Sequence, residues 1–163
     1  EQTSPDIGPF AGRLVESTPG TVPRAPAGVQ VTDFAAVATF DNPDDSPAGT
    51  LWDAGFEFRV TDISNRVVVD SLGDVYTALM GTGTQKVANT DAYDASPGAS
   101  NTLQLVVAGD RALFGGNGEF VVAFDLPDNP VASDVWTGAG WFNEDFVVGR
   151  VNDYRDFQVW LNE

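Results

Sequence analysis

The side chains of this chain that could bind a metal ion are aspartates gathered in two loops. Asp41, Asp44 and Asp45 belong to one loop, and Asp91 and Asp94 share another. Carboxylates and backbone carbonyls of a loop are the oxygen ligands that calcium requires, although neither loop has the twelve-residue EF-hand pattern. In a chain with 24 acidic residues, such groups also arise as solvated or turn-capping aspartates. Calcium at Asp41, Asp44 and Asp45 is therefore one expectation, and no bound cofactor is the other.

Side chains suited to catalysis are scarce. Histidine and cysteine are absent, which removes the commonest general base and the thiolate nucleophile. Glycoside hydrolysis needs two carboxylates about 5 to 10 Å apart. Glu57 lies on a predicted strand, but strand alternation places it opposite Trp52, Phe56 and Phe58, where solvent should surround it. The sequence therefore predicts no catalytic residue and a protein that is not an enzyme.

Aromatic side chains could stack on sugar rings. Trp136 and Trp141 are five positions apart, so on one continuous strand they point to opposite faces and one of them leaves the core. By the same alternation, Tyr154 and Trp160 lie opposite Phe157. Trp141, Trp160 and Tyr154 are therefore the candidate carbohydrate-binding residues. The alternative is that loops or the N-terminal segment cover both faces of these strands.

The charge of the chain excludes several partners. With 24 acidic and 8 basic residues, the net charge is -16, which repels nucleic-acid phosphates and anionic lipid headgroups. No apolar run reaches the 18 residues of a membrane span, so we expect neither nucleic-acid binding nor membrane insertion. The chain begins Glu1-Gln2-Thr3 without methionine, which suits a secreted, extracellular or cell-surface protein.

The apolar pattern predicts strands and no helix. Asn101 to Leu126 contains three apolar segments separated by Gly109-Asp110 and Asn117-Gly118, which is typical of an antiparallel meander. The other expected strands are 29–40, 52–61, 66–70, 74–80, 85–90, 134–142 and 146–161. The expected core faces are Trp52, Ala54, Phe56 and Phe58; Phe120, Val122, Phe124 and Leu126; and Phe157, Val159 and Leu161.

The N-terminal segment has a different composition. Residues 1–28 form a proline-rich arm with one predicted strand at 10–15, and residues 29–163 form the β-sandwich domain. Phe10, Gly12 and Leu14 alternate with the residues between them, so this strand could add to a sheet edge of its own domain or of a neighbouring molecule. Pairing within the molecule is the alternative to strand exchange, because it costs less entropy.

The strands also carry a family resemblance. The run of Leu103, Leu105, Val107, Gly109-Asp110, Phe114, Asn117-Gly118, Phe120 and Val122 resembles the central strands of concanavalin A-like lectin/glucanase (laminin-G-like) sandwiches. Residues 33–59 are similar to the early strand pair of bacterial surface-associated members, and 134–142 and 153–160 fit the same pattern. The resemblance implies an all-β fold, an antiparallel two-sheet jelly-roll sandwich. The E-x-D-x-x-E strand of the retaining glucanases does not occur in the sequence.

The resemblance leaves function open, because the superfamily contains sugar binders, glycoside hydrolases, calcium-dependent adhesion modules and structural domains. The first hypothesis is a non-enzymatic extracellular structural subunit that associates with identical subunits, for example in a filament, through Phe10, Gly12 and Leu14. The alternative is a carbohydrate-binding module whose partner is a glycan and whose binding depends on calcium.

Overall fold

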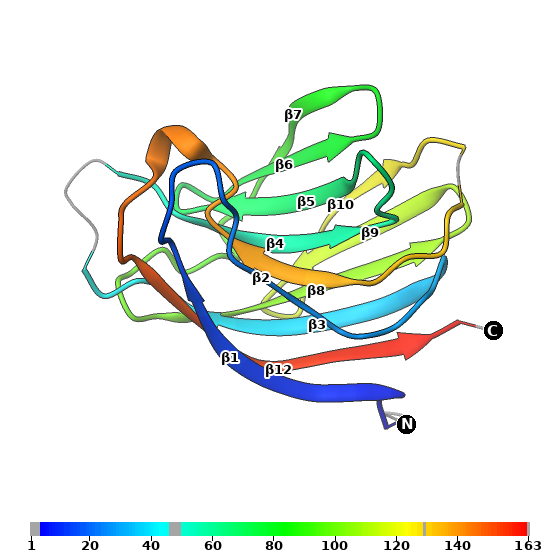
Figure 1. Ribbon diagram of the computed structural model, residues 1–163, viewed down its shortest axis with the longest axis horizontal. Helices are drawn as coiled ribbons and strands as arrows, with labels where there is room; N and C mark the ends of the chain where they lie inside the picture. Colours follow the sequence, from blue (N-terminus) through cyan, green and yellow to red (C-terminus); the bar gives the residue numbers. More distant parts are fainter. Residues whose placement is uncertain (1–3, 46–49, 129, 163) are drawn as a thin grey trace.

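The computed structural model, which describes residues 4–45, 50–128 and 130–162, is a sandwich of two antiparallel sheets (Figure 1). Sheet A has six strands in the order β1 (Ile7–Val15), β12 (Val151–Leu161), β3 (Phe34–Asp41), β8 (Ser100–Ala108), β9 (Arg111–Gly116) and β10 (Glu119–Asp125). Sheet B has six strands in the order β2 (Arg24–Pro26), β11 (Trp136–Ala139), β4 (Asp53–Phe58), β5 (Asn65–Asp70), β6 (Asp74–Leu79) and β7 (Gly83–Asn89). The predicted all-β, two-sheet antiparallel architecture is confirmed.

Helical structure is minimal. In the described part of the chain it amounts to one short 3₁₀ turn, η1 (Asn143–Asp145), between β11 and β12. None of these residues therefore forms a helix that could cross a membrane.

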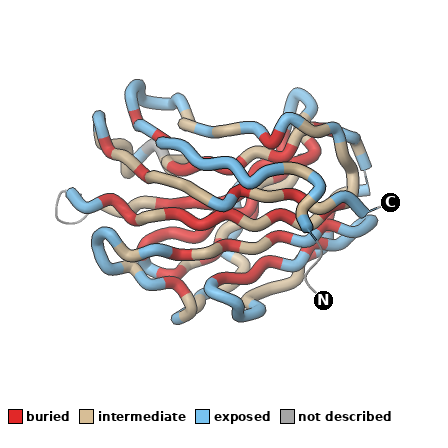
Figure 2. The backbone as a smooth tube through the Cα atoms, turned by 90° about the horizontal axis from the view of Figure 1, so that it is seen from below, coloured by how far each residue is buried: buried red, intermediate tan, exposed pale blue. Residues whose placement is uncertain are grey.

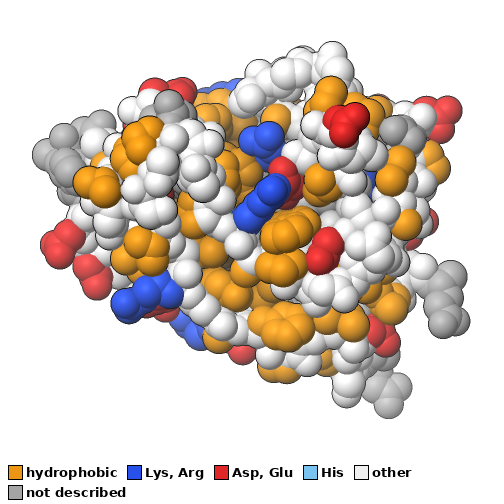
Figure 3. All heavy atoms as spheres, viewed as in Figure 1, with side chains coloured by type: hydrophobic (Ala, Val, Ile, Leu, Met, Phe, Trp, Pro, Cys, Tyr) orange, Lys and Arg blue, Asp and Glu red, His pale blue; other side chains and the backbone are white. Residues whose placement is uncertain are grey.

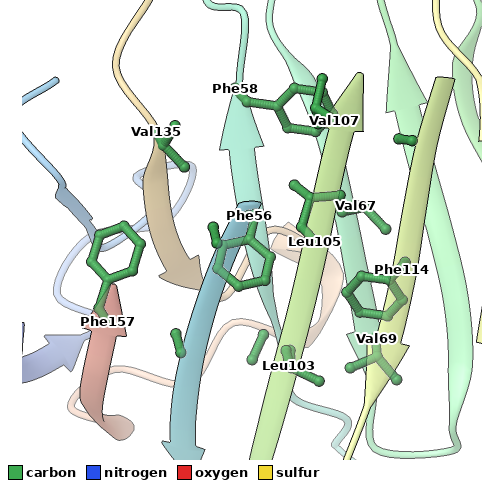
Figure 4. Packing of buried hydrophobic residues seen from close by; sticks show 14 of the residues in the cluster. Phe56, Phe58, Val67, Val69, Leu103, Leu105, Val107, Phe114, Val135 and Phe157 are labelled. Atoms are coloured by element: carbon green, nitrogen blue, oxygen red, sulfur yellow. The ribbon is translucent and has the colours of Figure 1, made fainter. Parts of the chain in front are cut away.

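The core lies between the two sheets and is built from alternate residues of their strands (Figures 2 and 4). Ala54, Phe56 and Phe58 of β4 are fully buried, as predicted. Phe58 packs edge-on against Phe34 of sheet A, with ring centroids 5.9 Å apart. Each such side chain contributes about 1.5–3 kcal/mol through burial, so this alternation is the main source of the sandwich's stability.

The predicted meander is present as β8, β9 and β10, which pair in sequence order. Its second turn contains Asn117 and Gly118 with φ angles of 51° and 83°. Positive φ at both positions is what a type I′ turn requires, and asparagine and glycine tolerate it best. The Asn117 side chain adds long-range contacts, accepting from the N–H of Thr102 and donating to the carbonyl of Ala92.

Two predicted core positions lie at the surface instead. Phe120 is 69% exposed, because a bulge between Phe120 and Val122 reverses which residues of β10 point inward. Leu161, the last residue of β12, is 38% exposed.

Both strands of the N-terminal segment are edge strands. β1 pairs with β12 in sheet A, and Leu14 enters the core. β2, which the sequence did not predict as a strand, pairs with β11 in sheet B. Residues 1–28 thus contribute one edge to each sheet.

A buried arginine holds the sandwich together at each end. Arg59 is 1% exposed at the end of β4 and donates to the carbonyls of Thr32 and Gly109 and to the Asp33 carboxylate. Arg150, which precedes β12, is also buried, and its Nε donates to Oε1 of Glu16 at 2.7 Å. Buried charges are stable only when paired and hydrogen-bonded, and both arginines meet this condition.

The pair of Arg150 and Glu16 anchors the connection between β11 and β12. Arg150 also donates to the carbonyls of Leu51 and Asp145, while Oε2 of Glu16 accepts from the N–H of Val147. The two side chains therefore tie together the end of β1, the residues before β4 and the whole 140–150 connection.

Asp53 holds the beginning of the same connection. It is 1% exposed, and its carboxylate accepts hydrogen bonds from the backbone N–H groups of Trp141 and Phe142 at 3.0 and 3.2 Å. Burial raises the pKa of Asp53 to about 6, although the two N–H donors and the nearby Arg150 act in the opposite direction.

We expect replacement of Arg150 by methionine to lower the free energy of unfolding by about 3–5 kcal/mol, because Glu16 is then buried without its cation. Urea unfolding measures the loss. As a control, Arg13→Met removes a cation from an exposed pair with Asp153 and should leave the midpoint nearly unchanged. The Glu16→Gln/Arg150→Met double variant should lose less than the two single variants together, and purely additive losses would contradict the coupling.

The stability of the protein should also depend on the ionisation of Asp53. Because its folded pKa of about 6 exceeds the unfolded value of about 4, the protonated carboxyl stabilises the fold fully below about pH 4. This contribution is lost as the pH rises through about 6. Relative to Asp53→Asn, the wild type should therefore lose about 3 kcal/mol between about pH 4 and about pH 7.5 in urea unfolding. Parallel pH profiles of the two proteins would show that Asp53 does not titrate in this way.

Candidate functional site

The outer face of sheet B carries a row of functional side chains across neighbouring strands. Because Ala54, Phe56 and Phe58 point into the core, Glu57 of β4 points outward. Its partners in the ladder are Trp136 of β11 and Arg66 of β5. Residues directly opposite in an antiparallel pair share a face, so all three lie together on the outside of the sheet.

Glu57 is the buried centre of this row. It points away from the core, as predicted, but the expectation that solvent surrounds it is wrong: the residue is 3% exposed. Its Oε1 accepts a hydrogen bond of 2.5 Å from Ser64, and Arg66 lies 3.4 Å from the same oxygen. Its Oε2 accepts from Arg24, which reaches over from β2. These cationic and hydroxyl partners compensate for the loss of water.

Two tryptophans flank this carboxylate. The guanidinium of Arg24 lies 4.8 Å from the centre of the Trp136 ring, within the range of a cation–π contact. Trp141 packs over Gly138, where a Cβ atom would lie 2.7 Å from its ring. Gly138 follows Trp136 by two positions and shares its face, so both tryptophans lie on the outside of sheet B.

The expectation that Trp136 and Trp141 point to opposite faces is therefore wrong. It assumed one continuous strand, whereas β11 ends at Ala139 and Gly140 reverses the chain with a φ of 72°. Such a φ favours glycine, and the Asp53 carboxylate then holds the N–H of Trp141.

Trp141 separates two hollows on this face. One, of about 370 Å³, is lined by Gly20, Thr21, Val22, Arg24, Glu57, Arg66 and Trp141. The other, of about 50 Å³, is lined by Arg66, Val68, Tyr76, Thr77, Ala78, Thr84, Trp141 and Phe142. Basic side chains with an acidic one between them lie near the middle of this face, among apolar side chains (Figure 3). The arrangement offers a flat apolar surface beside hydrogen-bond donors and acceptors.

The other two predicted carbohydrate-binding residues lie elsewhere. Asp156, with a φ of 53°, forms a bulge in β12 between Arg155 and Gln158, which reverses the alternation. Tyr154 pairs with the core residue Phe40 and packs edge-on against Phe157, whereas Trp160 lies on the outer face of sheet A. The structure thus separates Trp141, Tyr154 and Trp160 instead of bringing them together.

The predicted strand-exchange residues pair within their own molecule. Phe10 lies opposite Phe157, Gly12 opposite Tyr154 and Leu14 opposite Asn152 in the β1–β12 ladder. A Cβ at Gly12 would lie 2.8 Å from the Tyr154 ring, so glycine allows the close contact. Exchange of this strand between subunits stays a prediction.

One carboxylate of the predicted calcium loop is engaged by an arginine of the protein. Both carboxylate oxygens of Asp41 accept hydrogen bonds from Arg155, and Ser100 donates to one of them. Partial burial disfavours the charged form, but these hydrogen bonds hold the pKa of Asp41 below its usual value. Asp44 and Asp45 are exposed, and the end of the loop lies outside the described residues. No group of three metal-ligating side chains is found in the described part of the chain, and calcium stays a prediction.

Sequence reasoning identified Trp141 and considered Trp136 without choosing it, but missed Arg24 and Arg66. Strand alternation alone places Glu57 and Arg66 on outward faces, and this was the available signal. Their proximity depends on the strand order β2-β11-β4-β5, which local patterns do not encode.

Comparison with known proteins shows what fold this site is built on. No family model matches the chain, and no curated protein matches its sequence. Solved structures do match. The carbohydrate-binding module CBM66 from Bacillus subtilis has a TM-score of 0.60 at 12% identity, over 94% of this chain and 92% of that one. Sheep galectin-11 has a TM-score of 0.51 at 18% identity, over 89% of this chain and 96% of that one.

Enzymes match as well. The Crh5 transglycosylase has a TM-score of 0.59 at 11% identity, over 98% of this chain and 78% of that one, and an alginate lyase also matches. These neighbours overturn the expectation that the protein is not an enzyme, which rested on missing histidine, cysteine and sequence motifs. Catalysts and binding modules share this architecture, so lack of a motif does not exclude activity.

Identities of 11–18% show a shared fold and nothing finer. The two six-stranded antiparallel sheets of the chain and these structural neighbours both indicate the same fold. The chain has the fold of the concanavalin A-like jelly-roll sandwiches.

Proposed function

We propose that this protein recognises a carbohydrate on the outer face of sheet B. The observation that carries the proposal is Trp141, which lies across this face between two hollows and beside Arg24, Glu57 and Arg66. The apolar faces of sugar rings stack on aromatic side chains, while their hydroxyl groups require donors and acceptors.

The rigidity of the site supports binding. Gly138 lets the Trp141 ring approach the sheet, and Asp53 holds its backbone N–H. The arginines are held by the buried Glu57. Side chains positioned before the ligand arrives lose less entropy on binding.

The structural neighbours agree with this class of ligand. CBM66 is a carbohydrate-binding module by name, and the Crh5 transglycosylase was solved in complex with NAG. At their low identity these neighbours support the proposal through the fold alone. The side chains on the outer face of sheet B are what place the proposed binding site there.

Trp141→Ala should weaken glycan binding at least tenfold, because stacking is lost while the sheet beneath remains. A glycan array identifies the ligands, and calorimetry then compares the wild type with the variant. Trp141→Phe should retain part of the affinity. Phe120→Ala is the control, since it removes an exposed aromatic side chain from sheet A.

Two additions to the same experiment separate the alternatives. A chelator tests the calcium dependence predicted for Asp41, Asp44 and Asp45. Product analysis of each bound polysaccharide tests for turnover, because enzymes share the fold. An array without signal, or equal affinities for the wild type and Trp141→Ala, would contradict carbohydrate recognition at this face.

A further inference from the structure

The two hollows have a positive net charge, whereas the whole molecule is strongly negative. Their charged lining residues are Arg24, Glu57 and Arg66, which leaves a surplus of one positive charge. The chain as a whole has a net charge of -16 and only 8 basic residues. Two of these cations therefore meet at one place in an otherwise strongly acidic protein.

Glu57 positions the two arginines but contacts only some of their N–H groups. Arg24 donates to Glu57 through Nη1, and Nε of Arg66 lies 3.1 Å from Ser64 and 3.4 Å from Glu57. Among the described residues, the other N–H groups of these two guanidiniums have no hydrogen-bond partner. Their side chains are 41% and 38% exposed, so these donors remain accessible.

Glu57 itself is not free to bind a ligand. Its two carboxylate oxygens already accept from Ser64 and Arg24, and it is almost completely buried. Its role is to hold two cations close together, which would otherwise repel each other. The charged groups of these hollows that remain available to a ligand are therefore the cationic donors of Arg24 and Arg66, beside the ring of Trp141.

We propose that the carbohydrate bound at this site carries an acidic group, either a carboxylate or a sulfate, which binds to Arg24 and Arg66. This inference rests on the proposed function and adds the ligand class. A guanidinium matches such an anion with two parallel N–H donors, and charge-assisted hydrogen bonds are about twice as strong as neutral ones. Trp141 supports the sugar ring that carries the acid.

The acidic surface limits how much charge the ligand can carry. At physiological ionic strength, charges beyond about 8 Å are largely screened, so one acid group responds mainly to the nearby arginines. A chain with an acid on every sugar places further negative charges against the remaining acidic surface. The favoured ligand therefore has isolated acid groups among neutral sugars.

Two matched pairs of ligands test the inference by calorimetry. The first is a xylo-oligosaccharide with one glucuronic acid and the same compound as its methyl ester. The second is a galacto-oligosaccharide with one sulfate and its desulfated form. The wild type should bind the charged member of at least one pair at least tenfold more tightly, and the pair concerned identifies the acid as a carboxylate or a sulfate.

Variants of Arg66 test whether this residue causes the preference for the charged ligand. Arg66→Gln should reduce the difference between charged and neutral ligands at least fivefold, and Arg66→Lys should restore part of it because the positive charge remains. Arg13→Gln is the matched control: it removes the same charge from sheet A and should keep the preference. Circular dichroism checks the fold of each variant, and the wild-type comparison is valid even if a variant unfolds.

The outcomes distinguish this inference from the function on which it rests. Equal binding of the charged and neutral members of both pairs would overturn the acidic ligand while leaving carbohydrate recognition intact. A preference that Arg66→Gln leaves unchanged would also overturn it. Absence of binding to these ligands and to every glycan of the array would overturn both proposals.

Discussion

The buried ion pair between Arg150 and Glu16 is the interaction on which the rest of this structure depends. It joins the last residues of the edge strand β1 to the connection that leads from sheet B into sheet A. Through Leu51 it also reaches the residues before β4. Removing two charges from water costs free energy, and the pair offsets this cost only when both side chains are well hydrogen-bonded. Their hydrogen bonds set the position of the 140–150 connection, and Trp141 lies at its beginning.

A buried charge also determines how side chains are arranged on the outer face of sheet B. Glu57 is buried on a face that normally meets water, and it draws Arg24 from β2 and Arg66 from β5 toward one point. Trp136 covers part of the first guanidinium and Trp141 lies beside the second. A single buried acid thus holds cations from β2 and β5 beside two tryptophans, one in β11 and one just after its end.

The fold itself leaves the chemistry open. Similar sandwiches include a carbohydrate-binding module, a galectin, an alginate lyase and a transglycosylase. This chain carries a positive surplus on the outer face of sheet B, within a molecule of net charge -16. On a shared fold, function is decided by the residues placed on the common scaffold.

Local physics accounts for what the sequence by itself determined. Alternating apolar residues and turn-forming Asn117-Gly118 act over a few positions, so the meander and the core face of β4 could be predicted. The two-sheet architecture was implied by the family resemblance instead. Only the tertiary structure decided the site. The bulge at Asp156 separated Tyr154 from Trp160, and Gly140 brought Trp141 beside Trp136. These outcomes depend on strand order and on contacts between distant residues, which one-dimensional alternation does not contain.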